Sequence, residues 1–383
     1  MQALRSRTAF WATCLLFVYN GVVVGAFDGS LPITRARLHI GDEHIAILLV
    51  CTGLAAILGM QIMGRLADRV GARRLALIGF APLTLGALGY SMVGDYWALL
   101  VVGAVYGFGN GSLDITMNAI AVQVEKSRDR LWMSFFHGNW SIGNFIGSSL
   151  IVLIAYTFRL DDPATLVTTL WVITGLGLAA FAVAFFITPE TEVVEHKQEK
   201  DKKAKLPSFV YVLALMAIAF GLGEGTGFDW SALHVTTITG VPEATGALAV
   251  TSMSLCMVLI RLTGDWIVTR IGRRAVVFYG GIIAVAGYAI ASTGTEFWLL
   301  LVGWALVGLG MGVVAPQIYG IAGHMAGGRG LATVVTFGYA TFLAAPALIG
   351  FLVKLLGIQH AMIIPGTLLV GLVILSRFIP KDE

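Results

Sequence analysis

The feature that most constrains this chain is a series of long apolar runs separated by short polar segments. Each run has about 20 residues, which is the length that crosses a bilayer core of about 30 Å as a helix. In lipid, only helices and closed barrels satisfy all their backbone hydrogen-bonding groups, and these runs are too long and too uniformly apolar for barrel strands. Charged residues make up only 12% of the chain, about half the share in soluble proteins. The sequence therefore predicts an all-α membrane protein.

The runs predict twelve transmembrane helices. We place them near residues 9–31, 44–64, 75–94, 97–121, 133–157, 168–187, 208–230, 244–268, 275–293, 297–321, 331–354 and 358–378. An even number of crossings puts both termini on one side of the membrane. The first run is too long for the core of a signal peptide and no small-residue cleavage site follows it, so we expect it to remain as the first helix.

The basic residues indicate which side holds the termini. Of the 25 lysines and arginines, 21 flank helices on that side, counting Arg261 as the mark of the end of the eighth helix. The other side has Arg35, Arg37, Arg159 and Lys354. By the positive-inside rule, both termini are cytoplasmic. We therefore expect a multi-pass protein of the bacterial inner membrane.

Residues 189–206 form the longest charged segment, with EVVEHKQEKDKKAK at its centre. We interpret it as a solvated cytoplasmic linker between two six-helix halves, residues 1–188 and 207–383. Clustered lysines beside a membrane also attract anionic lipid headgroups, so a lipid contact is the alternative.

Three motifs recur at an offset of 201 residues. They are FDGS at 27–30 and FDWS at 228–231, GFGNG at 107–111 and GLGMG at 308–312, and RVG at 69–71 and RIG at 270–272. Chance could produce one such match, but three in register predict a duplicated six-helix unit and two pseudo-symmetric halves. Transporters built in this way place their substrate site near the membrane midplane, between the halves.

Several classes of function are disfavoured. The chain has no G-x4-G-K-[ST] phosphate loop, so ATP does not drive it directly. The net charge is only +3, and the basic residues lie in loops and do not form a continuous basic surface, so we expect no nucleic-acid partner. Cys14, Cys51 and Cys256 lie inside apolar runs and are interpreted as packing residues. Because there is no metal-ligand set and no nucleophile–base spacing, we expect neither an enzyme nor a bound metal or cofactor.

The loop after the second predicted helix reads GRLADRVGARR from Gly64 to Arg74. It resembles the signature loop of the major facilitator superfamily, G-x-L-a-D-r-x-G-r-k. The resemblance implies the twelve-helix fold of that family and a cytoplasmic gate that locks the outward-facing state. The residues assigned to this gate are Gly64, Arg65, Asp68, Arg69, Gly71, Arg73, Arg74 and Glu125. Substrate contact is the alternative for Glu125. In the second copy of the loop, Thr269 stands in place of Asp68.

Further segments resemble a narrower bacterial branch, the YbjJ-like inner-membrane facilitators, which are distantly similar to fucose–proton symporters. These segments include DITMN at 114–118, SFFHGNWS at 134–141 and EG at 224–225. The resemblance covers nearly the whole chain and implies transport, without implying one substrate. Members of this branch usually have an uncharged stretch at the position where this chain has Phe-Asp-Gly at 27–29. We therefore expect Asp28 to have a role particular to this protein.

Acidic residues inside the predicted helices are candidates for proton coupling. An ionised carboxylate in the apolar zone costs about 2.5–3.5 kcal/mol, so such acids tend to be functional. Asp28 and Asp229 each end the first helix of a half. Glu224 lies five residues deeper than Asp229, among glycines that predict a broken or flexible helix. The alternative for Asp28 and Asp229 is a solvated interfacial position or a helix cap.

A second group of candidates combines the fourth and fifth predicted helices. Asp114 and Asn118 are four residues apart and share one helix face, and His137 lies at a similar depth on the next helix. The three together predict a proton relay or a site for substrate hydroxyls. The alternative is an interhelical hydrogen-bond clamp, worth about 0.6 kcal/mol per bond in a membrane.

Polar and aromatic residues at mid-depth are candidates for a substrate cavity. They are Asn20, Asn118, Trp140, Asn144, Trp230, Arg261, Gln317, Tyr319 and Tyr339. Indole faces beside amide and hydroxyl groups suit a sugar-like solute, although drug exporters have such cavities too. Arg261 either pairs with Asp265 on its own helix or binds an anion in the cavity.

The leading interpretation is a secondary active transporter of a small polar, sugar-like solute, coupled to protons by symport and acting as a monomer among membrane lipids. Rocking of the two halves would give alternating access. The alternative is a proton-coupled exporter of small molecules or drugs, although the fifth helix has no proline like that in the signature of many drug–proton antiporters. A membrane protein without transport activity is the remote alternative.

Overall fold

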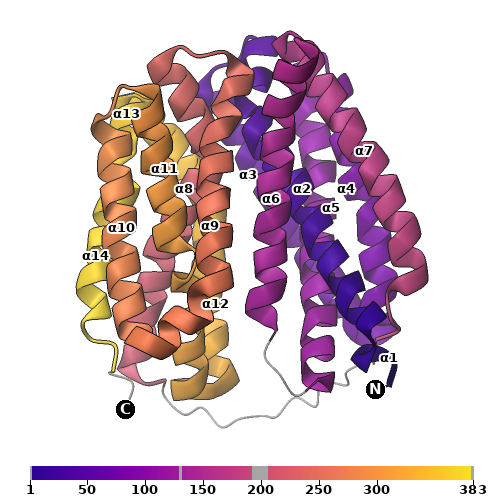
Figure 1. The fold of residues 1–383 in the computed structure, drawn as a ribbon, viewed down its shortest axis with the longest axis vertical. Helices are drawn as coiled ribbons and strands as arrows, with labels where there is room; N and C mark the ends of the chain where they lie inside the picture. The colour runs from indigo at the N-terminus through magenta and orange to yellow at the C-terminus, as the bar shows by residue number, and fades with distance from the viewer. Residues whose placement is uncertain (1, 129–131, 192–205, 381–383) are drawn as a thin grey trace. The chain divides into compact units, whose positions relative to one another are not determined.

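The computed structural model describes residues 2–128, 132–191 and 206–380, and all regular secondary structure within these ranges is helical (Figure 1). Contacts divide the chain into two compact units. Unit 1 comprises Met1–Gln198 and Pro242–Thr251, and unit 2 comprises Glu199–Val241 and Ser252–Glu383. The predicted boundaries of the halves and of the linker at 189–206 stay a prediction, and most of that linker lies outside the described residues.

Unit 1 has six long helices after a short first one. They are α1 (Gln2–Arg5), α2 (Arg7–Arg37), α3 (Asp42–Val70), α4 (Ala72–Met92), α5 (Tyr96–Ser127), α6 (Met133–Phe158) and α7 (Asp162–Ile187). Side-chain caps explain where three of them begin, because a cap satisfies backbone N–H groups that have no partner in the first turn. Ser6 caps α2, Asp95 caps α5 and Asp161 caps α7. In this unit α2 packs against α6, and α3 against α5.

Unit 2 contains the remaining helices. They are α8 (Ser208–Thr239), α9 (Glu243–Ile271), α10 (Arg273–Thr293), α11 (Phe297–Met311), α12 (Val314–Leu356), α13 (Ile358–Ala361) and α14 (Ile363–Ser376). The first two turns of α9 belong to unit 1. There the Asp162 carboxylate accepts hydrogen bonds from the backbone N–H groups of Glu243 and Ala244, at 3.3 and 3.1 Å. In unit 2 α8 packs against α12, and α10 against α11 and α14.

The boundaries in the last third of the chain differ from the predicted ones. The predicted helices at 297–321 and 331–354 correspond to α11 and the long α12, which has non-helical backbone at Ala326 and Gly327. Gly327 has φ of 60°, a conformation that glycine adopts without the steric cost of a Cβ atom. The predicted helix at 358–378 begins as the short α13 before α14.

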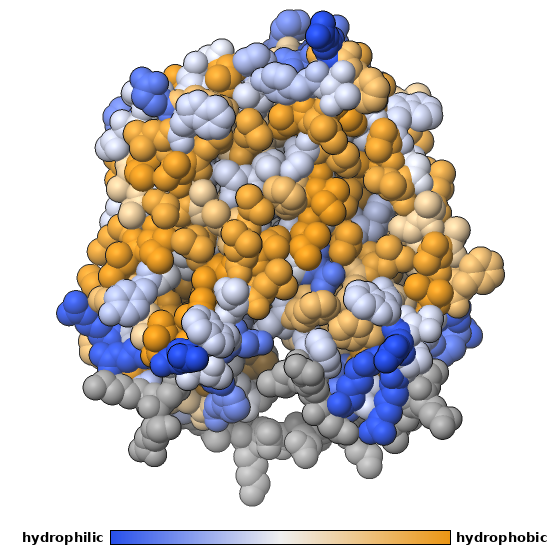
Figure 2. All heavy atoms as spheres, in the orientation of Figure 1, coloured by the Kyte–Doolittle hydropathy of each residue, from blue (hydrophilic) through white to orange (hydrophobic). Residues whose placement is uncertain are grey.

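The membrane-spanning character of the chain is confirmed. Among the described residues, eleven helices are long and apolar enough to cross a membrane, and Ala344–Leu356 is a shorter apolar helix that overlaps the predicted span at 331–354. Large apolar side chains face outward, including Trp97, Phe186 and Trp298, which are 75%, 81% and 73% exposed. Figure 2 shows such hydrophobic residues over the helices of both units. An exposed apolar surface of this extent requires lipid around it.

The helices repeat with the predicted offset. α8, α9, α10, α11 and α14 begin 201 residues after α2, α3, α4, α5 and α7, and α3 and α9 have the same length of 29 residues. Gly71, between α3 and α4, has φ of 87°, and Gly272, between α9 and α10, has φ of 81°. Both junctions therefore use glycine for a backbone conformation that other residues rarely adopt.

The packing of the glycine motifs repeats as well. A Cβ atom on Gly107 would lie 2.1 Å from the carbonyl oxygen of Thr52 in α3. A Cβ atom on Gly308 would lie 2.0 Å from the carbonyl oxygen of Met253 in α9, which is 201 residues after Thr52. Small residues let two membrane helices approach closely, and here they do so at the same pair of positions in each unit.

Candidate functional site

A buried ion pair joins α8 and α9 inside unit 2. A guanidinium nitrogen of Arg261 lies 3.0 Å from a carboxylate oxygen of Glu224, and Glu224 is 7% exposed. The sequence predicts that Arg261 marks the cytoplasmic end of its helix. In the structure it lies inside α9, ten residues before the helix ends. The predicted pairing of Arg261 with Asp265 is also wrong, because its partner is on another helix and Asp265 is exposed. Charges inside a membrane protein are costly unless paired, and they commonly mark functional sites.

The glycines around Glu224 serve packing, whereas the sequence predicts that they break the helix. α8 is continuous from Ser208 to Thr239. A Cβ atom on Gly227 would lie 2.7 Å from the sulfur of Met253, and one on Gly223 would lie 3.2 Å from Leu369. Because these glycines have no side chain, large side chains from neighbouring helices pack directly on the α8 backbone near Glu224.

Arg261 also contacts the place where one helix ends. Its Nε donates a hydrogen bond to the carbonyl oxygen of Gly312, 3.1 Å away, between the end of α11 and the start of α12. The last carbonyl groups of a helix have no partner within that helix and accept side-chain donors. One side chain therefore ties an acid on α8 to a break in the backbone, so a change in the ion pair would reach the α11–α12 turn.

A tyrosine on α10 completes the polar core of unit 2. The hydroxyl of Tyr288 donates to the carbonyl oxygen of Gly223, and Tyr288 interacts electrostatically with Glu224 and Asp229. Tyr319 of α12, a predicted cavity residue, interacts electrostatically with Glu224. Sequence reasoning missed Tyr288 because a single phenol in an apolar helix forms no motif.

The other predicted residues of unit 2 have less defined surroundings. Trp230 is fully buried on α8, next to the partly exposed Asp229. Gln317 is half-buried on α12. The side chain of Tyr339 lies outside the described part of the structure.

Unit 1 has a neutral hydrogen-bond network at its centre. The indole nitrogen of Trp140 on α6 donates to the amide oxygen of Asn20 on α2, at 2.8 Å. The amide nitrogen of Asn20 donates in turn to the amide oxygen of Asn110 on α5, also at 2.8 Å. The structure thus joins two predicted cavity residues. Asn110 was missed, although it is the one polar residue in the repeated glycine motif at 107–111.

Two members of the predicted cluster of Asp114, Asn118 and His137 contact each other. The Asn118 amide donates to the Asp114 carboxylate at 3.2 Å and to the Asp114 carbonyl oxygen at 2.9 Å. His137 packs edge-to-face on Phe17, with ring centroids 5.4 Å apart, and is exposed, and its place in the cluster stays a prediction. Asn144 is fully buried on α6, where its backbone carbonyl packs against Gly25 of α2.

Asp28 is buried in unit 1, with 4% exposure. It interacts electrostatically with Tyr90 of α4, and its neighbour Phe27 stacks on Tyr106 of α5 at 4.5 Å. The structure therefore places Asp28 within the helix bundle of unit 1, whereas a solvated position was the alternative.

The predicted gate loop lies at the junction of α3 and α4. Arg73 forms an ion pair with Glu190 and donates to the carbonyl oxygen of Phe185, near the end of α7. Arg65, Arg69 and Arg74 are exposed. Gly64 lies within α3 and Gly71 at its end. The side chain of Asp68 is outside the described residues. Glu190 was missed, because nothing in the sequence links it to a loop more than a hundred residues earlier.

Glu125 has local partners in the structure. Its carboxylate accepts hydrogen bonds from the backbone N–H groups of Trp132 and Met133, at 2.5 and 2.8 Å. These donors lie at the start of α6, where a negative charge also interacts favourably with the helix dipole. The role of Glu125 in a gate stays a prediction.

Comparison with known proteins identifies the class. The sequence matches the Major Facilitator Superfamily over residues 13–234 and again over 213–383, and the chain belongs to this family. It is 29% identical over 354 residues to an uncharacterized transporter of Sinorhizobium fredii (strain NBRC 101917 / NGR234), covering 91% of this chain and 92% of that protein. It is 28% identical over 359 residues to an uncharacterized MFS-type transporter of Yersinia pestis, covering 91% and 90%.

Solved structures of transporters share the fold. The nucleoside transporter NupG superposes with a TM-score of 0.76 at 12% identity, over 96% of this chain and 98% of that one. The E. coli fucose:proton symporter FucP superposes with a TM-score of 0.65 at 17% identity, over 97% and 98%. The chain is therefore a multi-pass membrane transporter with the twelve-span fold of its family. The predicted resemblance to this family, and the distant similarity to the fucose symporter, are confirmed.

Proposed function

We propose that this transporter carries a small polar, sugar-like solute together with protons, by alternating access of its two halves. The observation that carries the proposal is the buried pair of Glu224 and Arg261, tied to the α11–α12 turn. An ionised Glu224 holds Arg261 in place. Protonation of Glu224 removes the charge that Arg261 pairs with, and a buried cation without its partner is unstable. Proton binding would in this way be converted into movement of the backbone at Gly312.

The neutral network of unit 1 supports a polar solute. Asn20, Asn110 and Trp140 present amide and indole groups without a net charge. Amides both donate and accept hydrogen bonds, as hydroxyl groups do, so they match a polyhydroxylated molecule. The shared fold of FucP and NupG, whose names refer to fucose and nucleosides, is consistent with a solute that carries sugar hydroxyls.

The orientation is also a proposal. The basic residues outside the membrane-spanning helices favour cytoplasmic termini, even when the buried Arg261 is removed from the flanking cations. We propose the bacterial inner membrane as its location and a monomer as its working form.

The test is reconstitution into proteoliposomes that contain a pH-sensitive dye. L-fucose, D-xylose and uridine are added outside, first without and then with an imposed proton gradient. Symport predicts that one of these solutes carries protons inward and accumulates when the outside is acidic. Proton movement in the opposite direction to the solute would favour the exporter.

Two variants connect the assay to the site. E224Q and D28N should abolish accumulation against a gradient, while exchange of solute across the membrane, which moves no net protons, partly survives. The control is E43Q, which neutralises an exposed acid at the start of α3. If both variants still accumulate solute like the E43Q control, neither acid couples transport to protons.

A further inference from the structure

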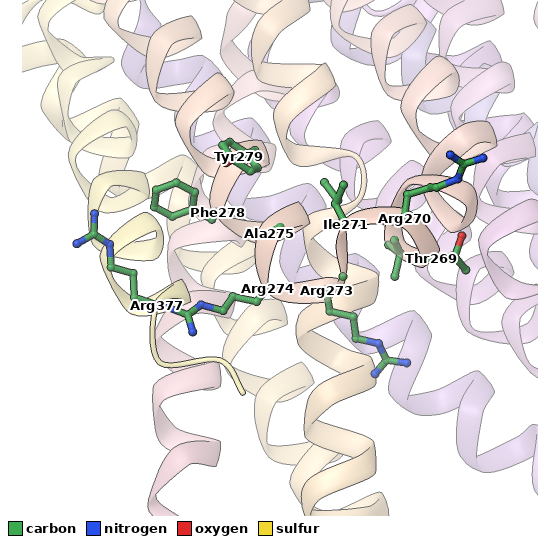
Figure 3. Close-up of a pocket in the computed structure, with 11 residues that line it drawn as sticks. Thr269, Arg270, Ile271, Arg273, Arg274, Ala275, Phe278, Tyr279 and Arg377 are labelled. Atoms are coloured by element: carbon green, nitrogen blue, oxygen red, sulfur yellow. The ribbon is translucent and has the colours of Figure 1, made fainter. Parts of the chain in front are cut away.

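Unit 2 has a cleft of about 1030 Å³ at the junction of α9 and α10, beside the end of α14 (Figure 3). Four arginines and two aromatic residues dominate its lining: Arg270, Arg273, Arg274, Arg377, Phe278 and Tyr279. We call it the arginine cleft. Among the described residues, no acidic side chain lines it. The lining of the arginine cleft therefore carries four positive charges.

Two of these arginines are held by aromatic rings. The guanidinium of Arg377 lies over the ring of Phe278, 5.7 Å from its centroid, and that of Arg270 lies over Trp266 at 5.1 Å. The N–H groups of a guanidinium lie in its plane and can bind a phosphate in bidentate fashion. Figure 3 shows the Arg274 side chain extended toward the backbone end of Arg377, while the guanidinium groups of Arg270, Arg273 and Arg377 point in other directions.

The cleft lies where three membrane spans end. α9 ends at Ile271, α10 begins at Arg273, and α14 ends at Ser376. Exposed aromatic side chains surround this level, since Trp266, Tyr279 and Phe378 are 61%, 57% and 66% exposed. Aromatic residues gather in this way at the boundary between lipid tails and headgroups. The arginine cleft is therefore at headgroup depth, with apolar surface beside it for acyl chains.

The equivalent junction in unit 1 indicates what the cleft binds. There the chain folds back after α7, so that Glu190 pairs with Arg73 and the Thr191 hydroxyl accepts from the Arg73 N–H. Arg274 occupies the position 201 residues after Arg73. In unit 1 a carboxylate of the chain itself meets this arginine, whereas the described residues that line the cleft of unit 2 include no carboxylate.

We propose that the arginine cleft binds the phosphate of an anionic phospholipid headgroup. Basic pockets between membrane helices bind such headgroups. A zwitterionic headgroup fits less well, because its own ammonium group would face four arginines. The proposal concerns a lipid and does not depend on which solute is transported or on its coupling to protons.

The experiment measures binding of dioleoyl phosphatidylglycerol to the purified full-length protein in detergent, by native mass spectrometry and by the shift in unfolding temperature. Dioleoyl phosphatidylcholine and inorganic phosphate are the comparison ligands. R274Q/R377Q should weaken binding of phosphatidylglycerol by about tenfold or more, because each basic residue near an anionic headgroup contributes several-fold. The control is R7Q/K126Q, which removes the same charge from two exposed residues of unit 1 and should change binding by less than about twofold.

The outcomes separate the possible sources of the effect. Equal binding of phosphatidylcholine, or inorganic phosphate that replaces the lipid at equal concentration, overturns the proposal. So does a loss in R7Q/K126Q as large as in R274Q/R377Q. R274K/R377K keeps both charges but not the bidentate geometry of the guanidinium, so its affinity for phosphatidylglycerol should lie between those of the wild type and R274Q/R377Q. If R274Q/R377Q unfolds at a lower temperature than the wild type in the absence of lipid, the loss of binding comes from altered folding and the proposal fails.

Discussion

The two units share a backbone pattern but bury different polar chemistry. Unit 2 holds an acid and a base, Glu224 and Arg261. At the positions 201 residues earlier, unit 1 has Val23 and Met60. The reverse holds for the neutral network of unit 1, since Gly221 and Met311 occupy the places in unit 2 that correspond to Asn20 and Asn110.

This difference teaches that the repeated features and the functional features belong to different residues. Glycines at helix contacts and helix junctions recur in both units, because they determine how closely the helices pack. The polar side chains of the ion pair and of the neutral network do not recur. Under the proposed function, unit 2 supplies the ion pair that responds to protons, and unit 1 supplies the hydrogen bonds that recognise the solute as well as a second proton-coupling acid, Asp28. The predictions below test this division of roles.

The largest effect should come from breaking the ion pair of unit 2. E224Q leaves Arg261 buried without its counter-charge, and loss of one partner of a buried pair costs about 3–5 kcal/mol. We expect a comparable fall in the free energy of unfolding, measured by chemical denaturation in detergent, together with loss of accumulation.

A double variant separates stability from function in the same pair. E224M/R261M replaces both charges with apolar side chains, which is often neutral or stabilising. It should therefore recover most of the stability that E224Q loses, but no accumulation of solute. Full transport by E224M/R261M would contradict the role of the pair in coupling.

The second prediction concerns the shared scaffold. G107A and G308A each place a methyl group about 2 Å from a carbonyl oxygen of the facing helix, and such overpacking costs about 1–3 kcal/mol. The two variants should lose similar stability, because the contact is the same in both units. G175A is the matched control, since nothing lies within 4 Å of a Cβ atom there. A large difference between G107A and G308A would show that the two units do not share this packing.

The sequence predicts the scaffold well because the scaffold depends on local properties. The run predicted at 133–157 is observed as Met133–Phe158, and that at 97–121 as Tyr96–Ser127. The extra turn and a half of α5 carries polar residues, which hydropathy excludes although the helical hydrogen bonds continue through them. Repeat offsets are likewise visible in sequence, because glycine is required wherever two backbones touch.

The site is predicted only in part, because it depends on contacts between distant segments. Glu224 and Arg261 are both recognisable as charges inside apolar runs, but 37 residues separate them and spacing within one helix favours Asp265 as the partner. Asn110 and Tyr288 are isolated polar residues whose partners become apparent only when the helices pack.

The third prediction tests the neutral network of unit 1. Asn20 makes two interhelical hydrogen bonds and Trp140 makes one of them. N20A should lower the free energy of unfolding by about 1–2 kcal/mol, because it removes both interhelical hydrogen bonds of the network, and W140F should lower it less because it removes one of them. In a double-mutant cycle the two should be non-additive by about 0.5 kcal/mol or more. Both should weaken the affinity for the solute more than they lower the maximal rate, and additive effects would mean that the network does not act as one unit.

The smallest effect on stability should come from the junction of α3 and α4. The pair of Arg73 and Glu190 is partly exposed, with Glu190 at 66%, so screening by water limits it. Exposed pairs contribute about 0.2–1 kcal/mol, and salt reduces this further. A double-mutant cycle of R73Q and E190Q should give a coupling free energy in this range that approaches zero in about 0.5 M salt. R274Q in unit 2, tested without added lipid, should not lower the free energy of unfolding, because no acidic side chain among the described residues lines the cleft around Arg274. If R274Q lowers the free energy of unfolding as much as R73Q does, the two junctions hold their arginines in the same way. The contrast between the junction of unit 1, where Glu190 pairs with Arg73, and the arginine cleft of unit 2 would then be wrong.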